Sequence, residues 1–394
     1  MVRNTFLFAV VVGVCLSGQT AIAQPPKPVS IAERLSKPVE FKYEATPLKE
    51  VVEDLKKRLK VSIVIETKVL EEAGISLENP IKGEVVEGKS RGGTALEDLN
   101  DLLRPYKLGV EIRHNALIIT TLERHTISFD CRIYRVLKAG ADTERLIDQI
   151  TSKLAPDSWD QRGGVASIKS IGRNVLVILQ TPAIHREINK KFGEELSLAI
   201  APLDRVAALV PTKGVDPLAN MRAVLSRQVS VEFAETPFRK AVESLAKTQK
   251  LPLVMDGNAF ATAFPYYNLD TPVTVNLQEL PVESMLTLVL DGMGMGWALD
   301  GERLLITLPA VAKGRLITIN YDVRDLAPTA DPKALSQALT RTVQPVSWAG
   351  TKGPGTFTAA EGELSITQTV QVHRLIETWL ADLRTALKPV PAEK

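Results

Sequence analysis

Residues 36–48 read SKPVEFKYEATPL, and residues 226–238 read SRQVSVEFAETPF. Both stretches contain an initial Ser, an alternation of apolar and polar residues, a Thr-Pro pair and then a large apolar residue. Position 226 lies 190 residues after position 36, a separation that exceeds the period of roughly 20–50 residues typical of solenoid repeats. The similarity therefore predicts that a block of several helices and strands occurs twice in the chain.

Each copy of the block is predicted to begin with a strand, a helix and a second strand. The alternating residues of the opening stretch have the period of a half-buried strand. After the Thr-Pro pair, apolar residues recur at i, i+3, i+4 and i+7, as they do on the buried face of a helix. We expect the Thr to cap this helix and the Pro to occupy its first position. A short apolar strand follows, VSIVIE at 61–66 and LPLVMD at 251–256.

The correspondence resumes after spacers, at 67–92 and 257–271, that differ between the copies. Residues 94–120 then match residues 281–307, with Leu-rich helices followed by a Leu-x-Ile-Thr ending. This part predicts a strand, a helix and a small hairpin in each copy, because a turn signal separates two apolar runs. The predicted strands are IKGEVVEG at 81–88 and PVTVNLQ at 272–278, and the predicted turns are His114-Asn115 and Asp300-Gly301.

A second kind of unit follows each of these blocks, with the predicted order β-α-β-β-α. It begins with strands at 126–136 and 315–323 and continues with helices at about 142–154 and 332–343. A Ser-Trp pair then precedes a Gly-rich turn, and a His stands early in the last predicted helix; the matching residues are Trp159 and Trp348, and His185 and His373.

Residues 36–121, and again 226–308, resemble the secretin and TonB short N-terminal (STN) domain. The unit that follows resembles the KH-like N1 domain of secretins. The resemblance implies an α+β fold, a tandem duplication of a small β-α-β/β-α-β-β domain followed by a β-α-β-β-α domain. Together with the residue patterns, the predicted organisation is a signal peptide (1–23), an STN-like domain (24–123), an N1-like domain (124–196), a linker (197–218), a second STN-like domain (219–310), a second N1-like domain (311–387) and a disordered tail (388–394).

The N-terminal residues predict export. A basic residue, Arg3, precedes an apolar run, and Ala21-Ile22-Ala23 is typical of a signal-peptide cleavage site. Cys15 is a candidate lipoprotein cysteine, but Val14 occupies a position where a small residue is expected. Removal of residues 1–23 takes away one positive charge and reduces the net charge from +2 to +1. A nearly neutral chain has no electrostatic attraction to nucleic acid.

The mature chain contains one cysteine and no predicted metal or cofactor site. Cys131 cannot form an intrachain disulfide once Cys15 is removed, and it is interpreted as a buried, inert thiol. Neither His185 nor His373 has a His, Cys or carboxylate at i+3 or i+4, so no zinc pair is predicted. GMGMG at 292–296 follows a helix and precedes a strand, the reverse of a dinucleotide-binding loop, and is interpreted as a connection.

Two features remain as candidates for recognition of a partner: the paired Trp residues and the spacers between the matching segments. Trp159 and Trp348 are either corner-filling indoles bonded to a carbonyl or exposed anchors for a partner protein. The GxxG spacing at 350–353 precedes a predicted strand instead of joining two helices, which does not favour nucleic-acid binding. The spacers at 67–92 and 257–271 are also candidates, since variable loops on a repeated scaffold are where specificity usually resides.

The sequence thus favours an exported, non-enzymatic scaffold that binds a protein partner in the cell envelope. The resemblance places it in the periplasm, peripheral to an outer-membrane or secretion assembly, as an array of modules without the pore. Self-association is left open. One alternative is an exported enzyme with a site between the halves, for which His125, Asp157 and Asp160 are the candidate residues. Another is binding of cell-wall polysaccharide through exposed Trp159 and Trp348.

Overall fold

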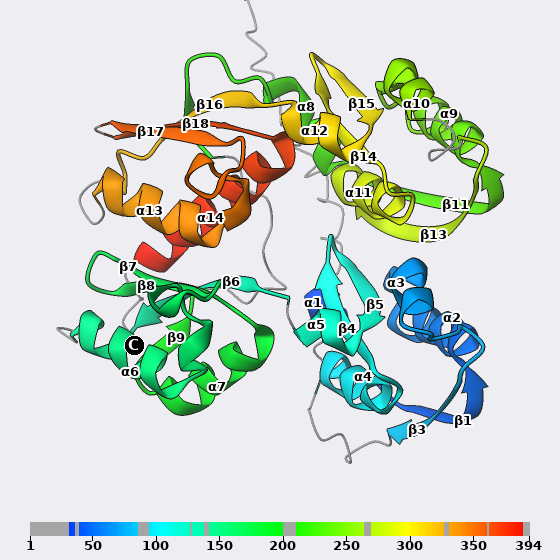
Figure 1. Cartoon of the computed structure of the whole chain (residues 1–394), viewed down its shortest axis with the longest axis horizontal. Helices are drawn as coiled ribbons and strands as arrows, with labels where there is room; N and C mark the ends of the chain where they lie inside the picture. Colours follow the sequence, from blue (N-terminus) through cyan, green and yellow to red (C-terminus); the bar gives the residue numbers. More distant parts are fainter. Residues whose placement is uncertain are drawn as a thin grey trace, which may run out of the picture.

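The computed structural model describes residues 31–35, 39–85, 94–126, 128–137, 142–199, 210–263, 269–326, 331–360 and 362–388. The signal peptide with Cys15, and the predicted tail after residue 388, lie outside the described residues. The described chain has an α+β fold with helices and several small sheets. Figure 1 shows four groups of elements, which we call the first to fourth domains in chain order.

The first and third domains have the same order of elements. In each, two long strands form an antiparallel pair, and a three-stranded sheet of order β2-β5-β4 or β12-β15-β14 lies beside it. The elements of the first domain are α1 (Ile31–Leu35), β1 (Phe41–Pro47), α2 (Leu48–Leu59), β2 (Ile63–Ile65), α3 (Thr67–Glu72), β3 (Pro80–Val85), α4 (Ala95–Leu103), β4 (Leu108–Arg113), β5 (Ala116–Thr121) and α5 (Leu122–Thr126). Those of the third are α8 (Ala219–Ser226), β11 (Gln228–Pro237), α9 (Phe238–Thr248), β12 (Leu253–Met255), α10 (Gly257–Thr262), β13 (Pro272–Pro281), α11 (Val282–Gly292), β14 (Gly296–Asp300), β15 (Arg303–Thr307) and α12 (Pro309–Gly314).

The second and fourth domains also share one order, and it is the predicted β-α-β-β-α. The second contains β6 (Asp130–Val136), α6 (Thr143–Lys153), β7 (Ser167–Ile171), β8 (Val175–Gln180), α7 (Pro182–Phe192) and β9 (Leu196–Leu198). The fourth contains β10 (Thr212–Lys213), β16 (Ile317–Asp322), α13 (Pro332–Thr342), β17 (Thr356–Ala360), β18 (Glu363–Gln368) and α14 (Val370–Leu387). Their sheets have the orders β7-β8-β6-β9 and β17-β18-β16-β10.

Irregular backbone features recur at equivalent positions in the two halves. The register between the long strands shifts after Tyr43 in β1 and after Phe233 in β11. Within these shifts, Ala45 has φ 56° and Glu235 has φ 47°, values in the left-handed region that non-Gly residues rarely adopt. Because such conformations cost free energy, their recurrence 190 residues apart indicates that both copies follow one backbone course.

The predicted Thr-Pro cap is wrong in both copies. Each Pro ends a strand, the helix begins at the next residue, Leu48 or Phe238, and neither helix receives a hydrogen bond from a capping side chain. Backbone carbonyls of the spacers accept from the first amides instead: Leu48 N donates to Asn79 O at 3.0 Å, and Phe238 N donates to Thr271 O at 3.0 Å. The described ends of the spacers therefore cap helices, which otherwise leave their first N–H groups unpaired.

Three of the predicted domain limits fall within or beside observed helices and strands. Residues 123/124 and 310/311 fall inside α5 and α12, which pack against β4 and β14 of the preceding domains. The predicted linker at 197–218 also contributes strands at both ends, because β9 pairs with β6 and β10 pairs with β16. The two strands occupy the same edge of their sheets. In the second domain this edge strand, β9, follows the last helix, whereas in the fourth domain it is β10, which precedes the third domain.

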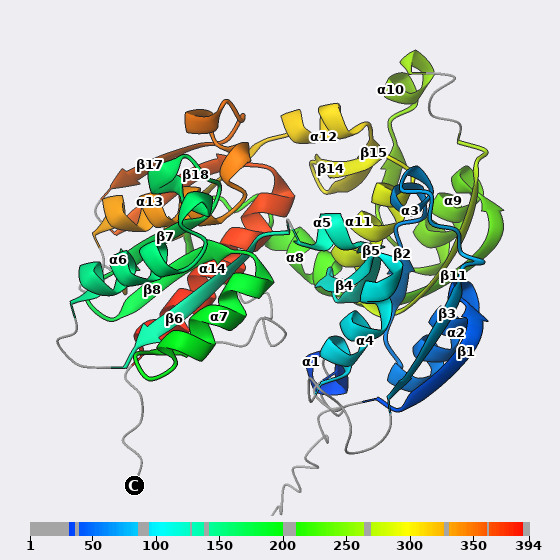
Figure 2. The same ribbon diagram turned by 60° about the horizontal axis from the view of Figure 1, so that its bottom comes forward.

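The four domains pack in two pairs (Figure 1). On one side of Figure 1 the fourth domain lies against the second, and on the other side the third lies against the first. Helices α13 and α14 pack on the β7, β8 and β6 strands of the second domain, and the turned view of Figure 2 shows the same neighbours. The two copies are therefore stacked on each other with the helices of one facing the sheet of the other.

Candidate interaction surfaces

Strand β8 of the second domain is buried on both faces. All six of its residues, VLVILQ, are buried. Leu176 and Ile178 belong to the second domain's own hydrophobic core, whereas Val175 and Val177 belong to the core of the second half of the chain. Successive side chains of a strand point to opposite faces, so β8 gives one face to its own helices and the other face to α13.

The equivalent face of the fourth domain is polar. Strand β18 reads ELSITQ, and its burial alternates between intermediate and buried. Glu363 and Ser365 stand where the second domain has Val175 and Val177. A charged or hydroxylic residue at these positions would lose its solvation under a packed helix. The sequence therefore allows a helix pair to cover the sheet of the second domain but not that of the fourth.

The helices that cover the second domain, α13 and α14, have small or apolar residues where the equivalent helices of the second domain have polar ones. Ala338 of α13 is fully buried and Trp379 of α14 is 4% exposed, whereas the equivalent residues of the second domain are Gln149, which is half-buried, and Lys191, which is exposed. At the C-terminal end of α14, the Arg135 guanidinium donates to the carbonyls of Thr385, at 2.6 Å, and Ala386, at 3.0 Å. A cation at this position satisfies carbonyls that the helix leaves unpaired.

The first and third domains show the same specialisation. Ala116 and Ile118 of β5 belong to the core of the second half, while Leu117 and Ile119 belong to the first domain's own core. Across this contact, the Ser62 hydroxyl donates to Gln278 O at 3.1 Å and accepts from Gln278 N at 2.8 Å. The third domain has exposed Arg303 where the first has Ala116, although Leu305, the equivalent of Ile118, is buried.

A buried ion network joins the third and fourth domains. The Glu377 carboxylate is completely buried and accepts from Arg222 Nε at 2.9 Å and from Arg374 Nη1 at 2.6 Å. Arg374 Nε also donates to Glu283 Oε2 at 2.8 Å, and Arg222 pairs with Asp216. Both guanidiniums and the carboxylate are thus compensated, as buried charges must be. Sequence analysis missed this network because its members come from three segments that lie far apart in the chain.

A second polar cluster lies where α11 approaches the first domain. Glu66 accepts from Arg113 Nη2 at 2.6 Å and from Thr120 Oγ1 at 2.5 Å. Burial alone would raise the pKa of Glu66, but these hydrogen bonds outweigh it and the pKa is lowered. Burial raises the pKa of Asp291 at the end of α11, and the charges of Arg113, Glu66 and Arg124 also act on it. The cluster therefore spans the contact between the two copies.

The two candidate anchors, Trp159 and Trp348, are buried. Their side chains are 1% and 3% exposed, and each indole N–H donates to a carbonyl five residues earlier, Leu154 O at 2.7 Å and Val343 O at 2.8 Å. The structure supports the corner-filling interpretation and gives no support to exposed anchors. It likewise removes the basis for polysaccharide binding through these residues.

His185 and His373 are buried in matching hydrogen bonds. Each ring lies between a Tyr hydroxyl and a backbone carbonyl: Tyr134 and Asp130 O for His185, at 2.9 Å each, and Tyr321 and Ile317 O for His373, at 2.8 and 3.0 Å. A carbonyl can only accept, so Nε2 carries the proton and Nδ1 accepts from the Tyr hydroxyl. Burial lowers the pKa of His373 to about 4. These residues hold the last helix on its sheet.

The residues proposed for an exported enzyme are not gathered together. Asp157 has a 97% exposed side chain, whereas Asp160, in the same domain, pairs with Lys169 at 3.1 Å. His125 lies in the first domain, against Gly109. Within the described ranges, no group of three or more His, Cys, Asp or Glu side chains is placed to hold a metal ion. Cys131 is half-buried, less enclosed than predicted.

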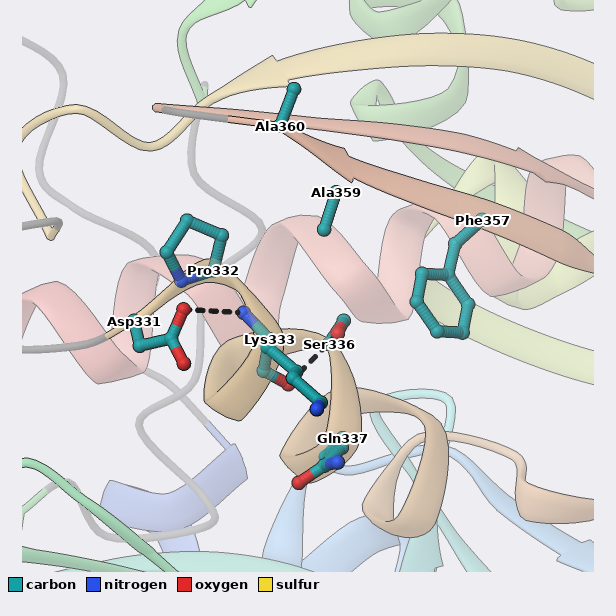
Figure 3. Close-up of a pocket in the computed structure, with 8 residues that line it drawn as sticks. All are labelled: Asp331, Pro332, Lys333, Ser336, Gln337, Phe357, Ala359 and Ala360. Carbon is teal, nitrogen blue, oxygen red and sulfur yellow. Dashed lines mark hydrogen bonds between the residues drawn. The ribbon is translucent and has the colours of Figure 1, made fainter.

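The edge of the fourth domain's sheet carries a groove. Strand β17 is the outermost strand, and all five of its residues, TFTAA, are exposed. Between β17 and the start of α13 lies an open groove of about 560 Å³, shown in Figure 3. Phe357 lies in this groove and is 39% exposed, although the equivalent Ile168 of the second domain is 2% exposed. The residue at this position of the edge strand is thus exposed in the fourth domain and buried in the core of the second domain.

Within the part of the chain that the structure describes, no helix is both long and apolar enough to cross a lipid bilayer. No protein-family model matches the sequence, and no curated protein matches it.

Three solved structures are similar to part of the chain. The first, described as a focussed refinement of InvGN0N1:SpaPQR:PrgHK from the Salmonella SPI-1 injectisome, matches 39% of this chain and 90% of its own at 8% identity and a TM-score of 0.17. The second, XcpQN012, matches 41% of this chain and 67% of its own at 16% identity and a TM-score of 0.16. The third, a GspC-GspD complex of the enterotoxigenic Escherichia coli type II secretion system, matches 40% of this chain and 96% of its own at 11% identity and a TM-score of 0.15.

Proposed function

We propose that the chain is an exported, non-enzymatic scaffold that binds other proteins of the cell envelope, built from two tandem pairs of STN-like and secretin N1-like domains. The proposal includes a periplasmic location beside a secretion or outer-membrane assembly. It also includes a signal peptide at 1–23, with domain ends near residues 126, 199 and 314.

One observation carries the proposal: the two copies differ where they contact each other. Val175 and Val177 of the second domain face α13, while Glu363 and Ser365 occupy the free face of the fourth domain. Capped ends of this kind are typical of repeat proteins that present a fixed surface. A rigid support for protein partners requires fixed packing between its domains, and the sequence differences between the two copies provide that packing.

The experiment is affinity capture with the mature chain, residues 24–394, from a periplasmic fraction of its natural host. The matched control is the Val177→Ser variant, in which the contact between the copies is weakened. We expect the wild-type chain to retain one or more envelope proteins in a fixed molar ratio and the variant to retain less. Capture of no protein in a fixed ratio, or equal capture by both chains, would contradict the proposed scaffold.

A further inference from the structure

The open edge strand of the fourth domain's sheet, β17, differs in composition from the exposed faces of the other sheets. The free sheet faces carry polar or charged residues such as Glu363 and Arg303. Strand β17, by contrast, contains no charge, no Pro and no break in its register with β18. Proteins usually protect edge strands with such features, because an unprotected edge pairs with another strand. The equivalent strand β7 carries Lys169 and lies under α13.

Among the described residues, the backbone groups that point outward from this edge can be identified. The N–H of Gly355, just before β17, donates to Ser347 O at 2.9 Å, and its carbonyl accepts from Ala349 N at 2.8 Å. Both groups of Gly355 therefore point away from β18. Since backbone groups alternate in direction along a strand, those of Phe357 and Ala359 point to the same open edge, while those of Thr358 point to β18.

The side chains of the edge are self-complementary about Thr358. Phe357 and Ala359 pair with the buried residues Ile366 and Leu364 of β18, so both face the helix side of the sheet and line the groove. A second β17 placed antiparallel, with Thr358 opposite its own copy, would put Phe357 opposite Ala359 twice. Each Phe ring would enter the space beside the partner's Ala359, next to Pro332 and Ser336, which Figure 3 shows open.

We propose that the occupant of this edge is a second copy of the chain, joined by a two-fold antiparallel β17–β17 pair into one continuous sheet. Phe357 and Ala359 each offer one donor and one acceptor, which gives four backbone hydrogen bonds across the axis. The same residues meet in both directions, as the symmetry of a two-fold contact requires. The inference does not depend on the proposed scaffold function.

Sedimentation velocity of the mature chain over a range of concentrations tests the proposal. We expect a reversible dimer in the wild type and its loss in the Thr358→Lys variant. Strand β7 already has a lysine, Lys169, at the equivalent position. In a dimer of the variant, two lysines would face each other at the axis. The control is Val346→Lys, which adds the same charge at a residue 73% exposed and outside β17; it should dimerise like the wild type.

A second set of variants tests the register without adding charge. Ala359→Phe places Phe against Phe and should abolish the dimer, whereas the double exchange Phe357→Ala with Ala359→Phe restores one Phe opposite one Ala and should recover it. Unchanged circular dichroism identifies variants that still fold. A wild type that stays monomeric at every concentration, a dimer that survives Thr358→Lys, or a double exchange that stays monomeric while folded would overturn the inference.

Discussion

Replacement of Val177 by Ser tests how much the contact between the copies contributes to stability. Val177 is completely buried and belongs to the core of the second half, although it is part of the second domain. Ser is the residue that the fourth domain has at the equivalent position, Ser365, on its half-buried free face. The substitution therefore converts the covered face toward the composition of the free one.

The expected cost follows from burial. Transfer of a buried Val side chain to water costs about 1.5–3 kcal/mol, and a hydroxyl buried without a partner adds about 1–3 kcal/mol. Because part of the space closes and Ser can bond to the backbone, we expect a loss of about 2–4 kcal/mol in the free energy of unfolding. The reverse change, Ser365→Val, alters only a solvated face and should stay within about 0.5 kcal/mol of the wild type.

Urea denaturation of the mature chain, followed by tryptophan fluorescence and far-ultraviolet ellipticity, measures both variants. Agreement of the two probes establishes whether the domains unfold together. Equal effects of Val177→Ser and Ser365→Val, or a cost below about 0.5 kcal/mol for Val177→Ser, would show that α13 does not cover β8 in solution.

Three further substitutions or conditions test separate parts of the structure. Glu377→Ala removes the buried carboxylate that two guanidiniums share and leaves each with one carboxylate, Asp216 for Arg222 and Glu283 for Arg374. The variant should lower the free energy of unfolding by about 3 kcal/mol, while Ala at the equivalent exposed Asn189 should have no measurable effect; similar costs for the two would contradict the network. The pKa of His373 is about 4 in the folded chain, against an ordinary value of 6.5. As the pH falls, the unfolded chain therefore binds the proton first, and acidification from pH 6.5 to 4 should remove about 3 kcal/mol of stability. Denaturation of the wild type and of His373→Gln across this pH range measures the loss, and parallel pH profiles of the two chains would refute it. A Cβ atom on Gly353 would lie 2.1 Å from the Ser347 carbonyl carbon, whereas a Cβ atom on Gly350 would meet nothing within 4 Å. Gly353→Ala should therefore lower the melting temperature, and Gly350→Ala should not. Equal melting temperatures of the two variants would contradict the close approach at Gly353.

The order of helices and strands could be predicted because it depends on local periodicity. The two predicted helices at 142–154 and 332–343 are observed at 143–153 and 332–342. The helix caps could not be predicted in the same way. Thr46 and Thr236 stand where a capping residue is expected, but backbone carbonyls of the spacers satisfy the first amides instead, and no local pattern reports which distant carbonyl will arrive.

The sequence does contain a signal for the contact between the copies. VLVILQ at 175–180 is continuously apolar, whereas ELSITQ at 363–368 alternates. A continuous apolar run is typical of a strand buried on both faces, and alternation is typical of one free face. Comparison of the two copies position by position would have indicated which sheet is covered. It would not have identified the covering helices, because burial patterns do not name the partner.

The candidate recognition residues failed for a related reason. Trp159 and Trp348 are large apolar side chains in turn segments, and turn segments usually lie on the surface. Their burial depends on carbonyls at the end of the preceding helix, which accept from the indole N–H groups. The exposed aromatic residue near this corner is Phe357, which lines the groove between β17 and the start of α13.

The most direct test of the central claim, that the second half of the chain covers the sheet of the second domain, is measurement of methyl–methyl nuclear Overhauser effects. In a sample labelled at Val, Leu and Ala methyl groups, Val175 and Val177 should show cross-peaks to methyl groups of α13, which includes Leu335, Ala338 and Leu339. Cross-peaks from Val175 and Val177 that stay confined to residues before 200, in a folded sample, would contradict the stacked arrangement.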